Sequence, residues 1–129
     1  LGDIPKSLQV FKASVGQDLG VVTPPDLKMI VSEILERKPS IVFMPHVETS
    51  VGVILHDNYI SEIAEACRKV GGLLCVDGIA SGTLWADMKN LGIDVYITAP
   101  QKGWSSPASC GIVLLGDRAL EVLYDKTQP

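Results

Sequence analysis

Four short runs of apolar residues, each of strand length, constrain the fold of this chain more than any other feature. They are "SIVFMP" at residues 40–45, "LLCVD" at 73–77, "VYIT" at 95–98 and "GIVLL" at 111–115. Because these runs are apolar throughout instead of alternating with polar residues, we expect strands that are buried on both faces. Such strands are typical of a mainly parallel sheet that is covered by helices.

The first helix is expected between the segment "FKAS" and the first apolar run. Thr23 is a candidate helix cap, and Pro24 and Asp26 suit the first helical turn. Apolar residues then recur at steps of three and four, which predicts an amphipathic helix that ends near Lys38, because Pro39 blocks its continuation.

Three more helices are expected, from residue 57 to the Gly71-Gly72 pair, at 86–91 and at 117–124. The alternation of strands and helices predicts a three-layer α/β/α fold, with a mainly parallel sheet covered by helices on both faces. With 47% hydrophobic and 20% charged residues, the 129 residues fit one compact domain.

The charge and apolar content narrow the classes of partner. The net charge is −4 and the chain has only 11 Lys and Arg, so nucleic acid is not an expected partner. No apolar run is long enough to span a membrane and no signal sequence is visible, so a cytoplasmic protein is expected. Cys67, Cys75 and Cys110 each lie in an apolar segment, which predicts buried reduced thiols.

Ligand groups in parallel sheets lie at the carboxyl ends of the strands, which we call the carboxyl edge. We expect four loops there, "HVETSVG", "DGIASGT", "APQKGWSS" and the loop after "FKAS". Asp77 ends one strand and Lys102 follows another, at a separation that suits one strand-helix-strand unit. A lysine that forms a Schiff base and an acid that pairs with a pyridinium nitrogen are what pyridoxal phosphate requires.

Simpler interpretations of these residues remain open at this point. An aspartate at a strand end is often a turn or cap residue, and a single loop lysine is usually solvated. The segment "ETS" at 48–50 is compatible with a simple turn in which a hydroxyl bonds back to the main chain.

The histidines and tryptophans are expected to have structural roles. No carboxylate or second histidine stands at ligand spacing from His46 or His56, so both are expected to be structural or solvent-facing, and no metal site is predicted. Trp85 and Trp104 are expected to serve in packing. No glycine-rich nucleotide-binding motif is present.

Three segments together resemble a known family. "PHVETSVGVIL", "LLCVDGIASGT" and "GIDVYITAPQKGWSSPASCGIVLL", in this order and spacing, closely resemble the class V aminotransferases. These belong to the fold-type I pyridoxal-phosphate enzymes and include alanine–glyoxylate and serine–pyruvate aminotransferases. The resemblance implies pyridoxal 5'-phosphate as the cofactor.

The resemblance also implies a role for individual residues. Lys102 matches the lysine that binds the cofactor covalently, and Asp77 matches the partner of the pyridinium nitrogen. Gln101 matches a residue that reaches the phosphate, Thr49 a hydroxyl near the phenolic oxygen, and Ile79 an apolar residue against one ring face. The segment "DGIASGT" departs from the more usual small-residue and Gly-Gly pattern, which leaves the substrate side of the pocket undefined.

Parts of the family's machinery cannot be located in this chain. Family members carry a glycine-containing phosphate loop and a stacking aromatic before this region, and a small domain with a substrate-carboxylate arginine after it. We therefore expect residues 1–129 to be the central part of the large domain, inactive alone, and the full-length protein to be a homodimer by resemblance.

The leading functional hypothesis is transfer of an amino group from alanine or serine to a 2-oxo acid such as glyoxylate or pyruvate. The alternatives are a lyase of the cysteine desulfurase or kynureninase type, and a catalytically silent α/β module. Desulfurase-like members usually carry histidine directly before the lysine, whereas this chain has Gln101, which favours transamination.

Overall fold

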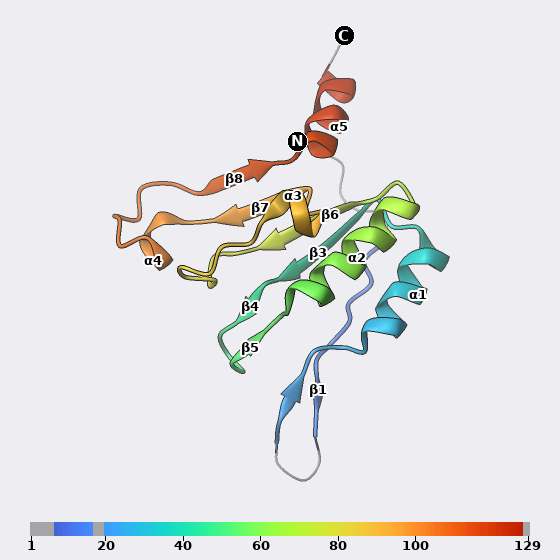
Figure 1. Ribbon diagram of the computed structural model, residues 1–129, viewed down its shortest axis with the longest axis horizontal. Helices are drawn as coiled ribbons and strands as arrows, with labels where there is room; N and C mark the ends of the chain where they lie inside the picture. The colour runs from blue at the N-terminus through green and yellow to red at the C-terminus, as the bar shows by residue number, and fades with distance from the viewer. Residues whose placement is uncertain (1–6, 17–19, 128–129) are drawn as a thin grey trace.

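A four-stranded sheet, in the order β3-β6-β7-β8, forms the centre of the computed structural model, which describes residues 7–16 and 20–127 (Figure 1). The parallel strands are β3 (Ile41–Pro45), β6 (Leu73–Asp77) and β7 (Val95–Thr98). The last strand, β8 (Ile112–Leu115), runs antiparallel to β7. The expected α/β fold with a mainly parallel sheet is confirmed, and each strand lies within one residue of its expected bounds.

Two long helices, α1 (Leu27–Arg37) and α2 (Asp57–Lys69), pack side by side over one face of the sheet (Figure 1). The shorter α3 (Met88–Leu91) packs against α2, and α5 (Asp117–Thr127) follows β8. The core lies between the two long helices and the sheet, where apolar side chains from both are buried: Ile30, Ile34, Met44, Ile60, Ile63, Ala64, Cys67, Leu74 and Val76.

The start of α1 corrects one expectation. Asp26, and not Thr23, is the N-cap, and its carboxylate accepts a hydrogen bond from the Met29 backbone N–H at 2.9 Å. The reason is the second proline, Pro25, because a residue that precedes proline is disfavoured in the helical conformation, so Pro24 cannot begin the helix. The expected end near Lys38 is confirmed, with that residue left-handed at the C-cap.

The face of the sheet opposite α1 and α2 is largely uncovered in the described part of the chain. Phe43 is 59% exposed and Val113 is 57% exposed. Side chains alternate along a strand, so these residues point away from the two helices. The two long helices therefore cover one face of the sheet, while Phe43 and Val113 on the opposite face stay exposed in the described part of the chain.

Two small hairpins accompany the main sheet. β1 (Ser14–Val15) and β2 (Val22–Thr23) pair as a separate two-stranded sheet, so the loop after "FKAS" does not leave a strand of the main sheet, contrary to our expectation, and its residues 17–19 lie outside the described residues. β4 (Val47–Glu48) and β5 (Val53–Ile54) form a second antiparallel pair directly after β3. The expected loop "HVETSVG" is thus a hairpin.

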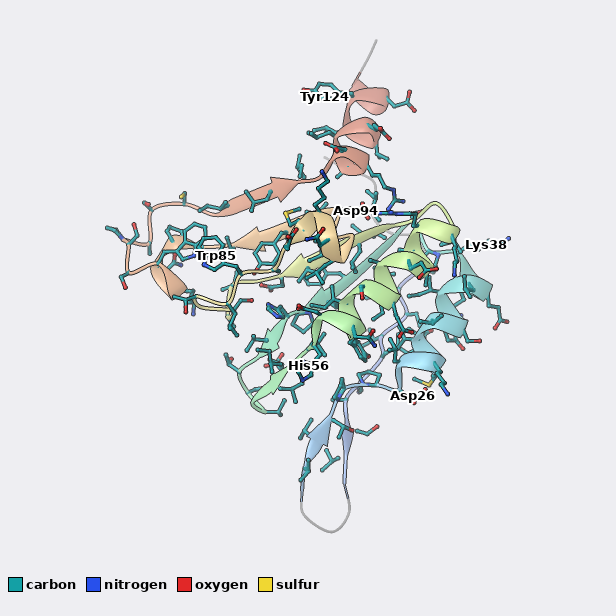
Figure 2. The ribbon with its side chains drawn as sticks, viewed as in Figure 1. Asp26, Lys38, His56, Trp85, Asp94 and Tyr124 are labelled. Atoms are coloured by element: carbon teal, nitrogen blue, oxygen red, sulfur yellow. The ribbon has the colours of Figure 1, made fainter. Side chains whose placement is uncertain are left out.

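An ion pair with a buried carboxylate and a half-buried guanidinium lies at the end of the sheet opposite the carboxyl edge. Asp94 accepts hydrogen bonds from the Leu74 backbone N–H at 2.8 Å and from the Arg118 guanidinium at 3.0 Å (Figure 2 labels Asp94). The same guanidinium donates to the Gly72 carbonyl at 2.8 Å. Arg118 belongs to α5, so this cluster fastens α5 to the beginnings of β6 and β7.

The cysteines follow the expectation in two of three cases. Cys67 and Cys75 are buried, and burial raises the pKa of the Cys67 thiol to about 11. Cys110 is exposed, because it lies in the irregular segment before β8 begins, so its expected burial is wrong. Within the described ranges, no helix is both long and apolar enough to cross a membrane.

Candidate active site

Three segments leave the carboxyl edge of the sheet together (Figure 1). They are the β4–β5 hairpin after β3, the loop 78–87 after β6, and the short helix α4 (Pro100–Gly103) after β7. The sequence did not predict α4. This short helix places Lys102 on a single turn that begins at Pro100, a residue suited to the first helical position.

Asp77 ends β6 at this edge with its side chain half-buried. Its Oδ1 accepts a hydrogen bond from the Ile79 backbone N–H at 2.9 Å, which orients the carboxylate. Among the described residues, the structure records no hydrogen bond to the second carboxylate oxygen, Oδ2. Burial, and to a smaller extent the negative charge of Asp77, raises the pKa of Cys75, which lies two residues earlier on the same strand. Asp77 therefore presents an oriented carboxylate with one oxygen available.

The Lys102 segment packs directly against the loop that follows Asp77. A side chain at Gly103 would overlap the carbonyl oxygen of Gly82 in that loop, so the two backbones touch. Gly82 itself has a left-handed φ of +62°, a conformation that favours glycine. The expected proximity of the Asp77 and Lys102 loops is therefore present, although the described residues show no hydrogen bond or ion pair between the two side chains.

The only two tryptophans of the chain reinforce this junction. The rings of Trp85, in the loop after β6, and Trp104, after α4, stack with centroids 5.8 Å apart and an interplanar angle of 19°. Figure 2 shows Trp85 beside the α4 segment. The expected packing role is realised through this stack, yet Trp85 is 80% exposed, so it packs at the surface and not in the core.

A substitution at Gly103 tests this junction. In Gly103→Ala, the new methyl group meets backbone and not a flexible side chain, so α4 must move away from Gly82, at a cost of about 1–3 kcal/mol. We expect a weaker near-ultraviolet circular dichroism signal from the Trp85–Trp104 stack. Gly111→Ala is the matched control, because a side chain there meets nothing within 4 Å. An unchanged signal in Gly103→Ala would contradict a tight junction.

Thr49 lies exposed in the turn between β4 and β5. The Ser50 backbone N–H and hydroxyl both donate to Glu48 Oε1, at 3.0 and 2.7 Å. Both bonds lower the pKa of the Glu48 carboxyl, and the bond from the backbone N–H has the larger effect. The interpretation of "ETS" as a simple turn is thus correct for the backbone. The Ser50 hydroxyl, however, bonds to the Glu48 carboxylate and not to the main chain. The turn presents Thr49 at the carboxyl edge.

His46, directly after β3, contacts the Asp77 loop in a way that the sequence did not predict. Its Nδ1 is hydrogen-bonded to the Ser81 hydroxyl at 2.8 Å, and its backbone N–H donates to the Asp77 carbonyl at 2.9 Å. Burial lowers the pKa of His46, against a smaller opposing effect of Asp57. The expectation that this histidine is structural is confirmed, while His56 is exposed at the N-cap of α2.

The structure thus brings some expected site residues together and leaves others apart. Asp77 and Ile79 are hydrogen-bonded neighbours, and Lys102 and Gln101 lie exposed on the helix that packs against their loop. Thr49 lies on the adjacent hairpin. All five residues lie at the ends of strands, or on segments that follow strands, at the carboxyl edge of the sheet.

The sequence of this chain is similar to those of one known family and of known proteins. The family model of the class-V aminotransferases matches residues 16–128. The chain is 31% identical to the alanine–glyoxylate aminotransferase of Oryctolagus cuniculus, over 91% of this chain and 32% of that protein. It is 34% identical to the (S)-ureidoglycine–glyoxylate transaminase of Bacillus subtilis, over 76% of this chain and 23% of that protein.

Solved structures show the same relationship. The ureidoglycine–glyoxylate aminotransferase of Bacillus subtilis superposes with a TM-score of 0.73 at 33% identity, covering 83% of this chain and 27% of that one. An alanine–glyoxylate aminotransferase of Nostoc sp. gives 0.70 at 26% identity, covering 80% and 27%. This chain spans about a third or less of the length of these relatives. With the family model matched over most of its length, the chain belongs to the class-V aminotransferase family.

Proposed function

We propose that this chain is the central part of the cofactor-binding large domain of an aminotransferase that uses pyridoxal 5'-phosphate. The amino donor is a small amino acid such as alanine or serine, and the acceptor is a 2-oxo acid such as glyoxylate or pyruvate. One observation carries the proposal: Asp77, with one carboxylate oxygen available, ends β6 directly before the loop that packs against the Lys102 helix. The relatives named for alanine, serine and ureidoglycine as donors and glyoxylate as acceptor support the substrate class.

The described residues fit the groups that this cofactor presents. Asp77 Oδ2 can accept a hydrogen bond from the ring nitrogen while Oδ1 remains bonded to the Ile79 N–H. Lys102 has an exposed amine for the aldehyde carbon, and Gln101 beside it has an amide for the phosphate. Thr49 offers a hydroxyl to the phenolic oxygen, and the apolar Ile79 side chain suits contact with a ring face.

These residues divide the chemistry of amino-group transfer among them. When bound, the cofactor supplies an electron sink for the electrons that are left when a bond to the amino acid's α-carbon breaks. The Asp77 carboxylate stabilises the protonated ring nitrogen on which that sink depends. Lys102 would hold the cofactor through its amine and, as a free amine, would accept the proton that leaves the α-carbon of the amino acid.

The remaining contacts are proposed to come from a longer protein. A phosphate dianion needs several donors, and Gln101 is the one we identify in this chain. A substrate carboxylate is best fixed by a bidentate arginine, which the sequence does not identify here. We therefore propose a longer protein in which these 129 residues form the centre of the large domain, and, from the resemblance to the class V aminotransferases alone, a homodimer.

Reductive labelling tests the proposed role of Lys102. We incubate the full-length protein with pyridoxal phosphate, reduce with borohydride and map the labelled peptide. The label is expected on Lys102, because it combines an exposed amine with a position next to the Asp77 loop. Lys102→Arg should lose the label, since a guanidinium does not form the bond. Labelling mainly at Lys89 on α3, unchanged in Lys102→Arg, would overturn the assignment.

Turnover of small amino acids tests the substrate class. The same preparation is given L-alanine or L-serine with glyoxylate, and glycine is measured. Formation of glycine that depends on added pyridoxal phosphate supports transamination. A parallel incubation contains L-cysteine and a thiol reductant, and release of sulfide there, without glycine formation from alanine or serine, would instead identify a lyase.

A further inference from the structure

His46 holds both ends of the segment that carries Asp77. Its backbone N–H donates to the carbonyl of Asp77 itself, at 2.9 Å, and its imidazole Nδ1 is bonded to the Ser81 hydroxyl at 2.8 Å. Residues 77–81 are thereby closed into a ring through one histidine. Inside that ring, the Ile79 N–H donates to the Asp77 carboxylate and the Ser81 N–H donates to the Gly78 carbonyl, at 2.9 and 3.1 Å.

The imidazole–hydroxyl bond is protected from water. His46 is 6% exposed and Ser81 is 4% exposed. A buried polar group that loses its partner pays the full cost of desolvation, so each of these side chains strongly favours the arrangement in which both are bonded. A packed apolar pair at the same place would fill space without fixing the rotation of the loop.

His46 also belongs to the base of the hairpin that carries Thr49. Its carbonyl accepts a hydrogen bond from the Leu55 N–H at 2.9 Å, which extends the β4–β5 ladder by one step. One residue therefore fixes the Asp77 loop relative to the Thr49 hairpin. These are the two segments proposed to meet the ring nitrogen and the phenolic oxygen, which stand at fixed positions on one rigid ring.

We infer that His46 and Ser81 are positioning residues: their buried hydrogen bond sets the orientation of the Asp77 carboxylate and its spacing from the Thr49 hairpin. The part of this inference that concerns the cofactor rests on the proposed function. The part that concerns the Asp77 loop stands on the contacts alone, so the two parts are tested separately.

The first experiment uses the protein without cofactor. Hydrogen–deuterium exchange is followed by mass spectrometry in a peptide that covers residues 77–84, with a peptide from the middle of α2 as the internal reference. In His46→Phe and in Ser81→Ala we expect exchange in the 77–84 peptide to become about tenfold faster, because one buried hydrogen bond is lost. His46→Asn should restore slow exchange, since its amide can place a hydrogen-bonding atom near the Nδ1 position.

The double variant His46→Phe/Ser81→Ala separates positioning from packing. Removing both polar partners relieves the unsatisfied group, so the melting temperature is expected to return close to that of the wild type. Exchange in the 77–84 peptide is expected to stay fast. Recovery of slow exchange together with the melting temperature would show that the pair only fills space, and would overturn the inference. His56→Phe is the matched control, because the side chain of this exposed histidine makes no cap hydrogen bond, and the 77–84 peptide should not change.

The second experiment uses the protein with pyridoxal phosphate bound. In the double variant, kcat is expected to fall about tenfold to a hundredfold, from misplacement of the Asp77 carboxylate. The single variant His46→Asn keeps Ser81 as a hydrogen-bond partner, so its kcat should stay close to that of the wild type. A double variant with fast exchange but normal kcat would overturn the positioning role. If the wild type shows neither turnover nor a label on Lys102, the proposed function fails, and the exchange result still decides whether His46 orders the loop.

Discussion

Asp77→Asn is expected to lower kcat by about two to three orders of magnitude while the protein remains folded. The asparagine Oδ1 can still accept the hydrogen bond from the Ile79 N–H, so the loop keeps its shape. A neutral amide, however, cannot stabilise a protonated ring nitrogen as a carboxylate does. The measurement is steady-state glycine formation from alanine and glyoxylate, with circular dichroism to confirm folding.

Asp87→Asn is the matched control for this charge removal. Asp87 caps α3 by accepting from the Asn90 N–H at 3.0 Å, and asparagine is an equally good N-cap. The control should therefore leave turnover unchanged. A nearly normal kcat in Asp77→Asn would show that another acid meets the ring nitrogen, and would remove Asp77 from the proposed site.

Asp94→Ala is expected to destabilise the protein by about 3 kcal/mol, a large part of the stability of a typical domain. The change leaves the half-buried Arg118 guanidinium without its carboxylate and the Leu74 N–H without its acceptor. Urea-induced unfolding, followed by circular dichroism, measures the shift of the midpoint. Asp94→Asn should lose less, because its amide oxygen can still accept from the Leu74 N–H.

An exposed ion pair provides the comparison for Asp94. Glu65 and Lys69 lie 2.7 Å apart on the surface of α2, with both side chains more than half exposed. Exposed pairs contribute little, so Glu65→Ala is expected to leave the midpoint almost unchanged. Equal losses in Glu65→Ala and Asp94→Ala would contradict the anchoring role of the buried cluster.

Strand and helix positions were predictable because long apolar patterns determine them. The runs at 73–77 and 95–98 became β6 and β7 with the expected bounds. β4, β5 and α4 do not coincide with a continuous apolar run or with an apolar period, and the sequence did not predict them. Apolar strands indicate that both faces of a sheet suit burial, but they do not indicate which segment covers each face. The exposure of the face that carries Phe43 and Val113 could therefore not be predicted.

The candidate site was predictable only in part. The position of Asp77 at the end of β6 and the proximity of its loop to Lys102 follow from strand order, which the sequence pattern indicates. The bond between His46 and Ser81 joins residues 35 apart in sequence and depends on tertiary structure. A histidine directly after a buried strand was the available signal, and its partner could not be chosen from several nearby hydroxyl residues.

The antiparallel pairing of β7 and β8 has a consequence for how the site can vary. Residues 99–111 connect two strands that are paired with each other, with Thr98 opposite Ile112, whereas the other connections within the sheet are crossovers. Doubling the length of such a loop costs only about 0.6 kcal/mol in loop-closure entropy. Contacts at Gly103 and Trp104 already hold α4, so the exposed residues 105–110 can lengthen or shorten independently. Evolution can therefore reshape the approach to Lys102 by changing loop length while the lysine itself stays in place.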